Sequence, residues 1–111
     1  MKYFVNEMER SASGSTCYFE LQKGRYCGKR WKKDSMSIHM DIFDETHLHD
    51  LFSSVVNFDY FGLTEITIDE WNTLVDKAHS IGGKIEEIIS EIIPWVEDNY
   101  KKENVFTICG I

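Results

Sequence analysis

The sequence predicts an α+β fold in which a small, mostly antiparallel sheet, built from N-terminal strands and a C-terminal strand, carries about three helices on one face. Apolar residues alternate with period two in parts of the first 43 residues, and from residue 48 to residue 96 they recur with the 3.6-residue period of amphipathic helices. A short apolar run closes the chain. Because the chain has 111 residues and is 42% hydrophobic, we expect one domain that spans residues 1–111.

Three strands are expected in the first 43 residues. A short first strand includes Tyr3 and Val5, and small residues at 11–15 indicate a turn after it. Residues 16–22 alternate as a second strand, and residues 36–42 show the clearest period-two pattern. Six of the twelve Lys and Arg residues, together with two glycines, lie between these two strands, which indicates a long basic loop.

Two helices are expected in the middle of the chain. Asp44 can cap the first helix, whose apolar positions fall within residues 48–56. Thr67 and Glu70 have the spacing of a capping box at the start of the second helix. The glycine pair at 82–83 is typical of a helix C-terminus, so we expect the second helix to end there.

The third expected helix has the strongest pattern of the chain. Apolar residues recur at three- and four-residue steps across residues 85–96, and Pro94 predicts a kink or a break in this helix. Residues 58–63 form an aromatic connector between the first two helices. Residues 105–109 are apolar at nearly every position, so we expect them to form a strand that is buried on both faces and central in the sheet.

The net charge of −7 is distributed unevenly along the chain. Residues 1–40 carry eight Lys and Arg against four Asp and Glu, whereas residues 41–111 carry four Lys against fifteen Asp and Glu. An asymmetry of this kind bears on partners and on association rates rather than on the fold.

The composition also predicts the compartment. No apolar run approaches the roughly 18 residues that are needed to span a bilayer, and the first residues lack the apolar stretch of a secretory signal. Cys17, Cys27 and Cys109 are an odd set without CxxC spacing, which is typical of free thiols in a reducing compartment. We therefore expect a cytoplasmic protein with no membrane segment.

No catalytic motif stands out, so we expect a protein that is not an enzyme, uses no cofactor and takes no small-molecule substrate. Cys17 and Cys109 fall in expected strand cores, whereas basic neighbours would expose and activate Cys27, which is either a reactive thiol or an ordinary surface thiol. His47 and His49 are about 200° apart around a helix axis and cannot face one ion, so we expect no metal site. The cluster that has metal-ligand chemistry consists of His39, Asp41, Asp44, Glu45, His47, His49 and Asp50.

The acidic part of the chain has two interpretations. Its carboxylates are either the solvated faces of amphipathic helices or, because aromatic residues are interspersed with them, a surface that binds a basic partner protein. Aromatic anchors ringed by complementary charge are common in tight interfaces, and an acidic face accelerates the capture of a basic partner. The residues expected to contact the partner are Asp59, Tyr60, Phe61, Glu65, Asp69, Glu70, Trp71, Glu87, Glu91, Trp95, Glu97 and Asp98.

The basic loop supports an alternative function. Cations for phosphates and rings for stacking give it the composition of a nucleic-acid contact, although the acidic charge of the remaining chain disfavours such a ligand. A third interpretation is a solvated hairpin whose lysines protect an edge strand. The residues of this alternative contact are Lys23, Arg25, Lys29, Arg30, Trp31, Lys32 and Lys33.

In size, acidity and order of elements, the chain resembles the small immunity proteins of bacterial toxin systems, including those that neutralise contact-delivered toxins. Two stretches carry the resemblance: FGLTEITIDEW at residues 61–71, which leads into a helix, and VFTICGI at residues 105–111, which follows an acidic helix. The resemblance implies an inhibitor that binds one cognate toxin, often a nuclease, and covers its active site or substrate-binding surface. The basic loop departs from a uniformly acidic protein, and it either contacts an acidic patch on the toxin or faces away from it.

Overall fold

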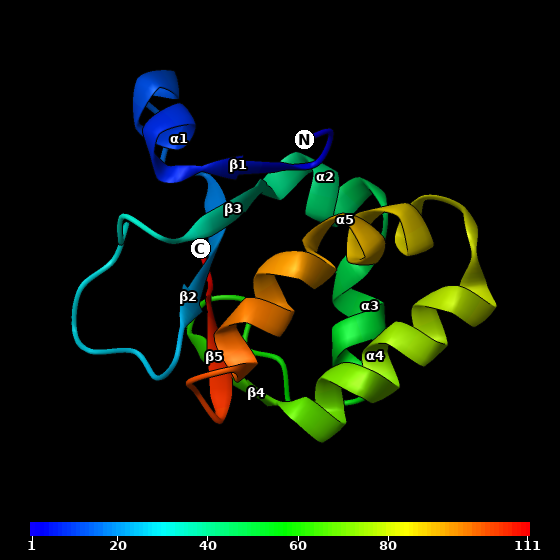
Figure 1. Cartoon of the computed structure of the whole chain (residues 1–111). Coiled ribbons are helices and arrows are strands. Elements are labelled where there is room, and N and C mark those ends of the chain that lie inside the picture. The colour runs from blue at the N-terminus through cyan, green and yellow to red at the C-terminus, as the bar shows by residue number, and fades with distance from the viewer.

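Five strands form one antiparallel sheet in the computed structural model, which describes all 111 residues. The order of the strands is β1-β3-β2-β5-β4, so β1 and β4 are the two edges. Five helices complete the α+β fold, which confirms the predicted class (Figure 1). The strands are β1 (Phe4–Asn6), β2 (Tyr18–Lys23), β3 (Met36–His39), β4 (Leu63–Thr67) and β5 (Val105–Cys109), and the helices are α1 (Glu7–Ser13), α2 (Met40–Glu45), α3 (Leu48–Ser53), α4 (Ile68–Ile81) and α5 (Gly83–Tyr100).

The two faces of the sheet are covered differently. On one face, α2 to α5 pack on apolar side chains, among them Phe19 of β2 and Phe106 of β5, and the ring of Phe19 stacks on Phe43 of α2 with 4.0 Å between centroids (Figure 1). On the other face, the basic loop between β2 and β3 lies over buried polar side chains, among them Glu20 and Gln22. Four helices, rather than about three, therefore share the apolar face, and the basic loop covers the part of the other face that lies on β2.

The central position of the last strand is confirmed. β5 pairs with β2 on one side and with β4 on the other, and all five of its residues are buried. A strand with neighbours on both edges and layers on both faces buries every side chain, which accounts for its continuous apolar sequence.

Two predictions for the first half of the chain are wrong. Strands and a turn were expected in the first 43 residues, yet residues 7–13 form the helix α1. Asn6 and Glu9 make a capping box at its start: Glu9 N–H donates to Asn6 Oδ1 at 2.9 Å, and Asn6 N–H donates to Glu9 Oε1 at 3.0 Å. The strand expected at 36–42 ends at His39, whose Nδ1 accepts the N–H of Asp41 at 3.0 Å and so caps α2. Asp44 consequently lies inside α2 and caps no helix.

The second and third predicted helices agree with α4 and α5. Thr67 and Glu70 form the expected capping box, and Gly82 ends α4 with a φ of 70°. α5 continues through Pro94 without interruption, so of the predicted kink or break, the break is wrong. A proline removes one backbone donor, and the burial of Ile92 and Val96 on either side of it holds the helix together. No helix is both long enough and apolar enough to cross a membrane.

Candidate interaction surface

Two of the α5 carboxylates predicted to bind a partner hold the N-terminal segment instead. Glu91 accepts the backbone N–H groups of Lys2, Tyr3 and Phe4 at 2.9, 2.9 and 2.8 Å. Glu87 accepts the hydroxyl of Tyr3 at 3.2 Å and pairs with Lys2 at 3.3 Å. Partial burial opposes ionisation of Glu91, but the three backbone donors and the nearby N-terminal amine hold the pKa of Glu91 below its ordinary value.

The next two α5 residues of the predicted surface are also engaged within the chain. Lys23 donates to Asp98 at 2.5 Å, and this contact lowers the pKa of the Asp98 carboxyl. The indole N–H of Trp95 donates to the carbonyl of Asp34 at 2.9 Å. One stripe of α5 therefore fastens β1 and the basic loop to the domain, and Glu97 is the predicted α5 residue that makes no hydrogen bond or ion pair.

Two of the predicted aromatic contacts lie inside the domain. Trp71 is only 4% exposed and packs edge-on against Phe106, so it is not an exposed anchor. Tyr60 packs edge-on against Phe19, and its hydroxyl donates to Asp44 at 2.9 Å. Burial and the neighbouring carboxylate raise the pKa of Tyr60.

A buried carboxylate beneath the basic loop anchors it to the sheet. Glu20 of β2 is fully buried and accepts the N–H of Lys32 at 2.8 Å and the hydroxyl of Ser35 at 2.6 Å. Gln22 Nε2 bridges Glu20 and the carbonyl of Lys29 at 3.0 and 2.8 Å. The guanidinium of Arg30 lies 3.7 Å from the same carboxylate. Buried charge is retained when it is paired and hydrogen-bonded, and Glu20 meets both conditions.

Arg30 and Trp31 complete this attachment. Arg30 donates to the carbonyls of Cys109 at 3.3 Å, the last residue of β5, and of Gly110 at 2.7 Å, the residue after it. The ring of Trp31 lies between two guanidiniums, with Arg10 at 4.0 Å and Arg30 at 4.6 Å from its centroid. Trp31 also has a φ of 62°, a conformation that a bulky residue adopts only when its surroundings impose it. Arg30 therefore holds the loop on the sheet, and Trp31 joins the loop to α1.

The remaining basic side chains of the loop are more accessible. Arg25 reaches Glu65 of β4 at 3.3 Å in an exposed ion pair, and Lys29 and Lys33 are exposed. Pairs of this kind contribute little and do not bury the charge. Of the seven residues in the alternative contact, three thus present their charge to solvent at the loop.

A different group of side chains is exposed along β4, and its ion pair within the chain is that of Glu65 with Arg25. Phe61 is 78% exposed, Leu63 of β4 is 50% exposed and Ile68 at the start of α4 is 50% exposed. Glu65 and Asp69 are exposed among them. We call Phe61, Leu63, Glu65, Ile68 and Asp69 the edge surface, because they follow the free edge of the sheet from the turn before β4 to the first turn of α4. Leu63 and Ile68 were absent from the predicted contact residues.

A groove between α4 and α5 extends the edge surface. It has a volume of about 410 Å³ and shares Ile68 with the edge surface. Its floor is apolar, with Val75 and Ile93 from the two helices, and the hydroxyl of Tyr100 donates to the carbonyl of Ile66 at 2.7 Å. Burial raises the pKa of Tyr100 above the ordinary value of tyrosine. The lining residues are Ile68, Trp71, Asn72, Val75, Ile93, Glu97, Tyr100 and Lys101.

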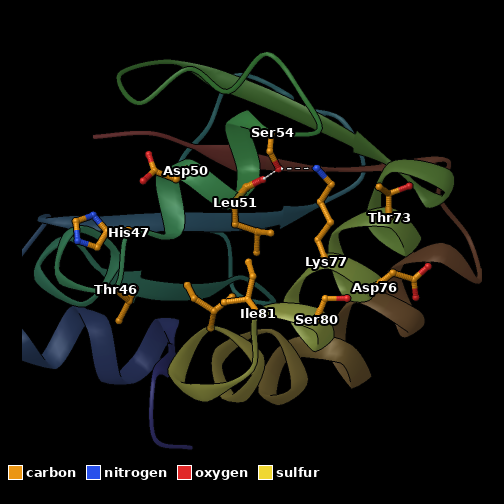
Figure 2. Close-up of a pocket in the computed structure, with 11 residues that line it drawn as sticks. Thr46, His47, Asp50, Leu51, Ser54, Thr73, Asp76, Lys77, Ser80 and Ile81 are labelled. Atoms are coloured by element: carbon orange, nitrogen blue, oxygen red, sulfur yellow. Dashed lines mark hydrogen bonds between the residues drawn. The ribbon is translucent and has the colours of Figure 1, made fainter.

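The largest hollow lies on the opposite side of α4, against α3 (Figure 2). It has a volume of about 620 Å³ and was not predicted, because its residues come from three separate helices and connectors. Lys77 donates to the hydroxyl of Ser54 at 3.2 Å across the rim. The hollow carries charge of both signs above apolar side chains, and its lining residues are Thr46, His47, Asp50, Leu51, Ser54, Thr73, Asp76, Lys77, Ser80, Ile81 and Ile85.

The histidines and cysteines are dispersed over the fold. No group of three or more His, Cys, Asp or Glu residues lies close enough to hold a metal ion. His39 caps α2, and His49 packs edge-on against Phe58 at 5.4 Å. Cys17 is exposed just before β2, so its predicted place in a strand core is wrong, and burial raises the pKa of the Cys109 thiol to about 11.

Comparison with known proteins adds no relative. No family model, no curated protein and no solved structure matches the chain. Candidate functions for this chain therefore rest on its own surfaces.

Proposed function

We propose that this protein binds and inhibits a basic partner protein, in the manner of an immunity protein that neutralises a cognate bacterial toxin. The edge surface is the observation that carries the proposal. It combines exposed apolar side chains with carboxylates, and these apolar side chains lie outside the hydrophobic core. Apolar patches of this kind, rimmed by charge, are typical of protein-binding sites.

The local charge favours a basic partner. From residue 57 to residue 70 the chain carries four Asp and Glu residues and no Lys or Arg. A field of one sign over an interface accelerates the encounter with a partner of opposite charge. A nuclease binds phosphates through a basic surface, so an acidic protein that occupies that surface excludes the substrate. A nuclease toxin is therefore the partner class that we propose.

The proposed contact is narrower than the one expected from the sequence. Glu87, Glu91, Trp95 and Asp98 hold other parts of the chain, and Trp71 is buried. The contact then consists of the edge surface, with Asp59 before it and Glu97 on the rim of the adjoining groove.

Co-expression with the product of the adjacent upstream gene tests the proposal. We expect a stable complex on size-exclusion chromatography and relief of the neighbour's toxicity. The double variant Glu65→Lys, Asp69→Lys should weaken the complex at least tenfold. The matched control is Asp76→Lys, which reverses an exposed charge on the opposite side of α4 and should leave binding unchanged. A neighbour that is harmless and forms no complex would refute the proposal.

The alternative, nucleic-acid binding by the basic loop, makes an opposite prediction. Its exposed cations are Arg25, Lys29 and Lys33. Binding of single-stranded RNA that weakens steeply with salt and is lost in Lys29→Glu, Lys33→Glu would favour the alternative. Under our proposal this double variant binds the partner protein as well as the wild type does.

A further inference from the structure

We propose that β4 is a docking strand: an extended, basic segment of the partner protein pairs with the outer edge of β4 and adds a sixth strand to the sheet. This inference rests on the proposed function and specifies how the partner is held. β4 is the last strand in the order β1-β3-β2-β5-β4, so no strand of this chain pairs with its outer edge.

The register of β4 identifies the free backbone groups. Gly110 N–H donates to the carbonyl of Gly62 at 2.7 Å. Thr64 and Ile66 lie two and four residues further along the chain, so their N–H and C=O groups also point toward β5. Because hydrogen-bonding residues alternate along an antiparallel strand, the N–H and C=O groups of Leu63 and Glu65 point away from β5. No hydrogen bond from the loops or side chains of this chain reaches these backbone groups.

The opposite edge of the sheet shows how this chain closes an edge. The outward N–H groups of β1 belong to Phe4 and Asn6. Phe4 N–H donates to Glu91 at 2.8 Å, and Asn6 N–H donates to Glu9 at 3.0 Å. On β4, the N–H of Thr67 alone receives such a cap, from Glu70 at 2.9 Å. Natural sheets protect edges with charged side chains, above all lysine, and with proline or bulges, whereas β4, with the sequence LTEIT, has the single charge of Glu65 and neither lysine nor proline.

Charge identifies the occupant as a basic segment of another protein. Glu65 lies in the middle of β4, and its nearest cation is Arg25, whose side chain is 73% exposed. A second copy of this chain is disfavoured, because antiparallel pairing of β4 centred on Glu65 places two Glu65 side chains opposite each other. A partner strand with Lys or Arg opposite Glu65 pairs with its charge, and an apolar residue opposite Leu63 packs against its side chain.

Amide hydrogen exchange with a synthetic probe tests the docking strand. The probe is the seven-residue peptide TVTKTVT, in which Lys and Val lie two positions apart on one face, and the matched control is TVTETVT. The lysine peptide should slow exchange at Leu63 and Glu65 at least tenfold, and the effect should vanish with the glutamate peptide and in Glu65→Lys. No protection at these two amides, or protection confined to the basic loop, would overturn the inference, as would a dimer that forms through β4 without peptide.

A backbone variant separates this inference from the proposed function. Leu63→Pro removes an outward N–H while leaving the hydrogen bonds to β5, and Leu63→Ala truncates the same side chain but keeps the N–H. We expect Leu63→Pro to weaken the complex with the partner protein at least tenfold more than Leu63→Ala does. If the Leu63→Pro variant fails to fold, Glu65→Pro compared with Glu65→Ala provides the same test, because the N–H of Glu65 also points outward. If the complex forms and neither variant weakens it, the docking strand is wrong and the proposed function stands, whereas absence of any complex refutes both.

Discussion

The basic loop and the edge surface lie at the same sheet and differ in how their side chains are used. The loop has the most conspicuous composition in the chain and holds six of the twelve Lys and Arg residues, yet Arg30 fastens it to the end of β5 and Trp31 packs between Arg30 and Arg10 of α1. The edge surface has no conspicuous composition, yet Leu63 and Phe61 are exposed, and the outward backbone groups of Leu63 and Glu65 have no hydrogen-bond partner in the chain.

The number of charged residues in a segment therefore does not show whether their side chains are bound within the chain or available to a partner. Glu20 lies beneath the loop and binds the backbone N–H of Lys32, which no count of charges reveals. In the same way Glu91 lies on an acidic helix but binds three backbone N–H groups of the N-terminal segment. The following predictions test whether the loop is held by its own chain while the edge surface is not.

Removal of the buried carboxylate of Glu20 should cause the largest loss in the free energy of unfolding. Glu20→Ala leaves the guanidinium of Arg30 and the donors of Lys32 and Ser35 without their acceptor. We expect a loss of about 3–5 kcal/mol in the free energy of unfolding, measured by urea denaturation. The control Glu45→Ala, at an exposed position, should change it by less than about 0.5 kcal/mol. Equal effects of the two variants would show that the loop is not anchored at Glu20.

Glu91→Gln should cause the next largest loss in the free energy of unfolding, and this loss should depend on pH. Hydrogen bonds to a charged group contribute about 1.5–3 kcal/mol, and we expect a loss of that order at pH 7. The pKa of Glu91 is lowered in the folded state. Its contribution is therefore complete above the ordinary glutamate pKa of about 4.3 and is lost as the pH falls through the lowered value. Denaturation at pH 7 and pH 3 should show the difference between wild type and variant shrinking at the acid end, and a difference that grows would contradict this assignment.

Substitution of Trp31 should cause a smaller loss in the free energy of unfolding. Trp31→Ala removes the ring between Arg10 and Arg30, which should lower the free energy of unfolding by about 1–2 kcal/mol. Trp31→Gly removes the same ring but adopts the positive φ freely. The glycine variant should therefore be at least as stable as the alanine variant in thermal denaturation. A less stable glycine variant would show that the backbone at Trp31 is not strained.

The edge surface should give the smallest change in stability. Leu63→Ala and Glu65→Gln alter exposed side chains outside the core, so each should change the free energy of unfolding by less than about 0.5 kcal/mol. A larger loss in urea denaturation would show that these residues support the fold, which would remove the contrast with the basic loop.

Sequence patterns predicted the helical part of the fold well and the edge strand poorly. The capping box at Thr67 and the apolar stripe of α5 are local signals, so α4 and α5 were predictable. The strand character of β4 was missed because its alternation covers only five residues and joins directly to the cap of α4. The capping box of Asn6 and Glu9 was present in the sequence, but the alternation at Tyr3 and Val5 favoured a strand without a helix after it.

The candidate site was predictable only in part, for a different reason. Asp59, Phe61, Glu65 and Asp69 are exposed where the sequence placed them. The tasks of Glu91, Asp98 and Trp95 depend on contacts with residues 61 to 89 positions away in the chain. No local pattern encodes such contacts, so the sequence could not separate carboxylates that hold the fold from carboxylates that are free.

Amide hydrogen exchange of the free protein tests the contrast between the two regions most directly. Lys32 N–H donates to Glu20 and Gly24 N–H donates to Asn99, so we expect both loop amides to exchange slowly. Along β4, Thr64 and Ile66 should be slow, whereas Leu63 and Glu65 should exchange fast. Rapid exchange at Lys32 and Gly24, together with protection of Leu63 and Glu65, would contradict this account.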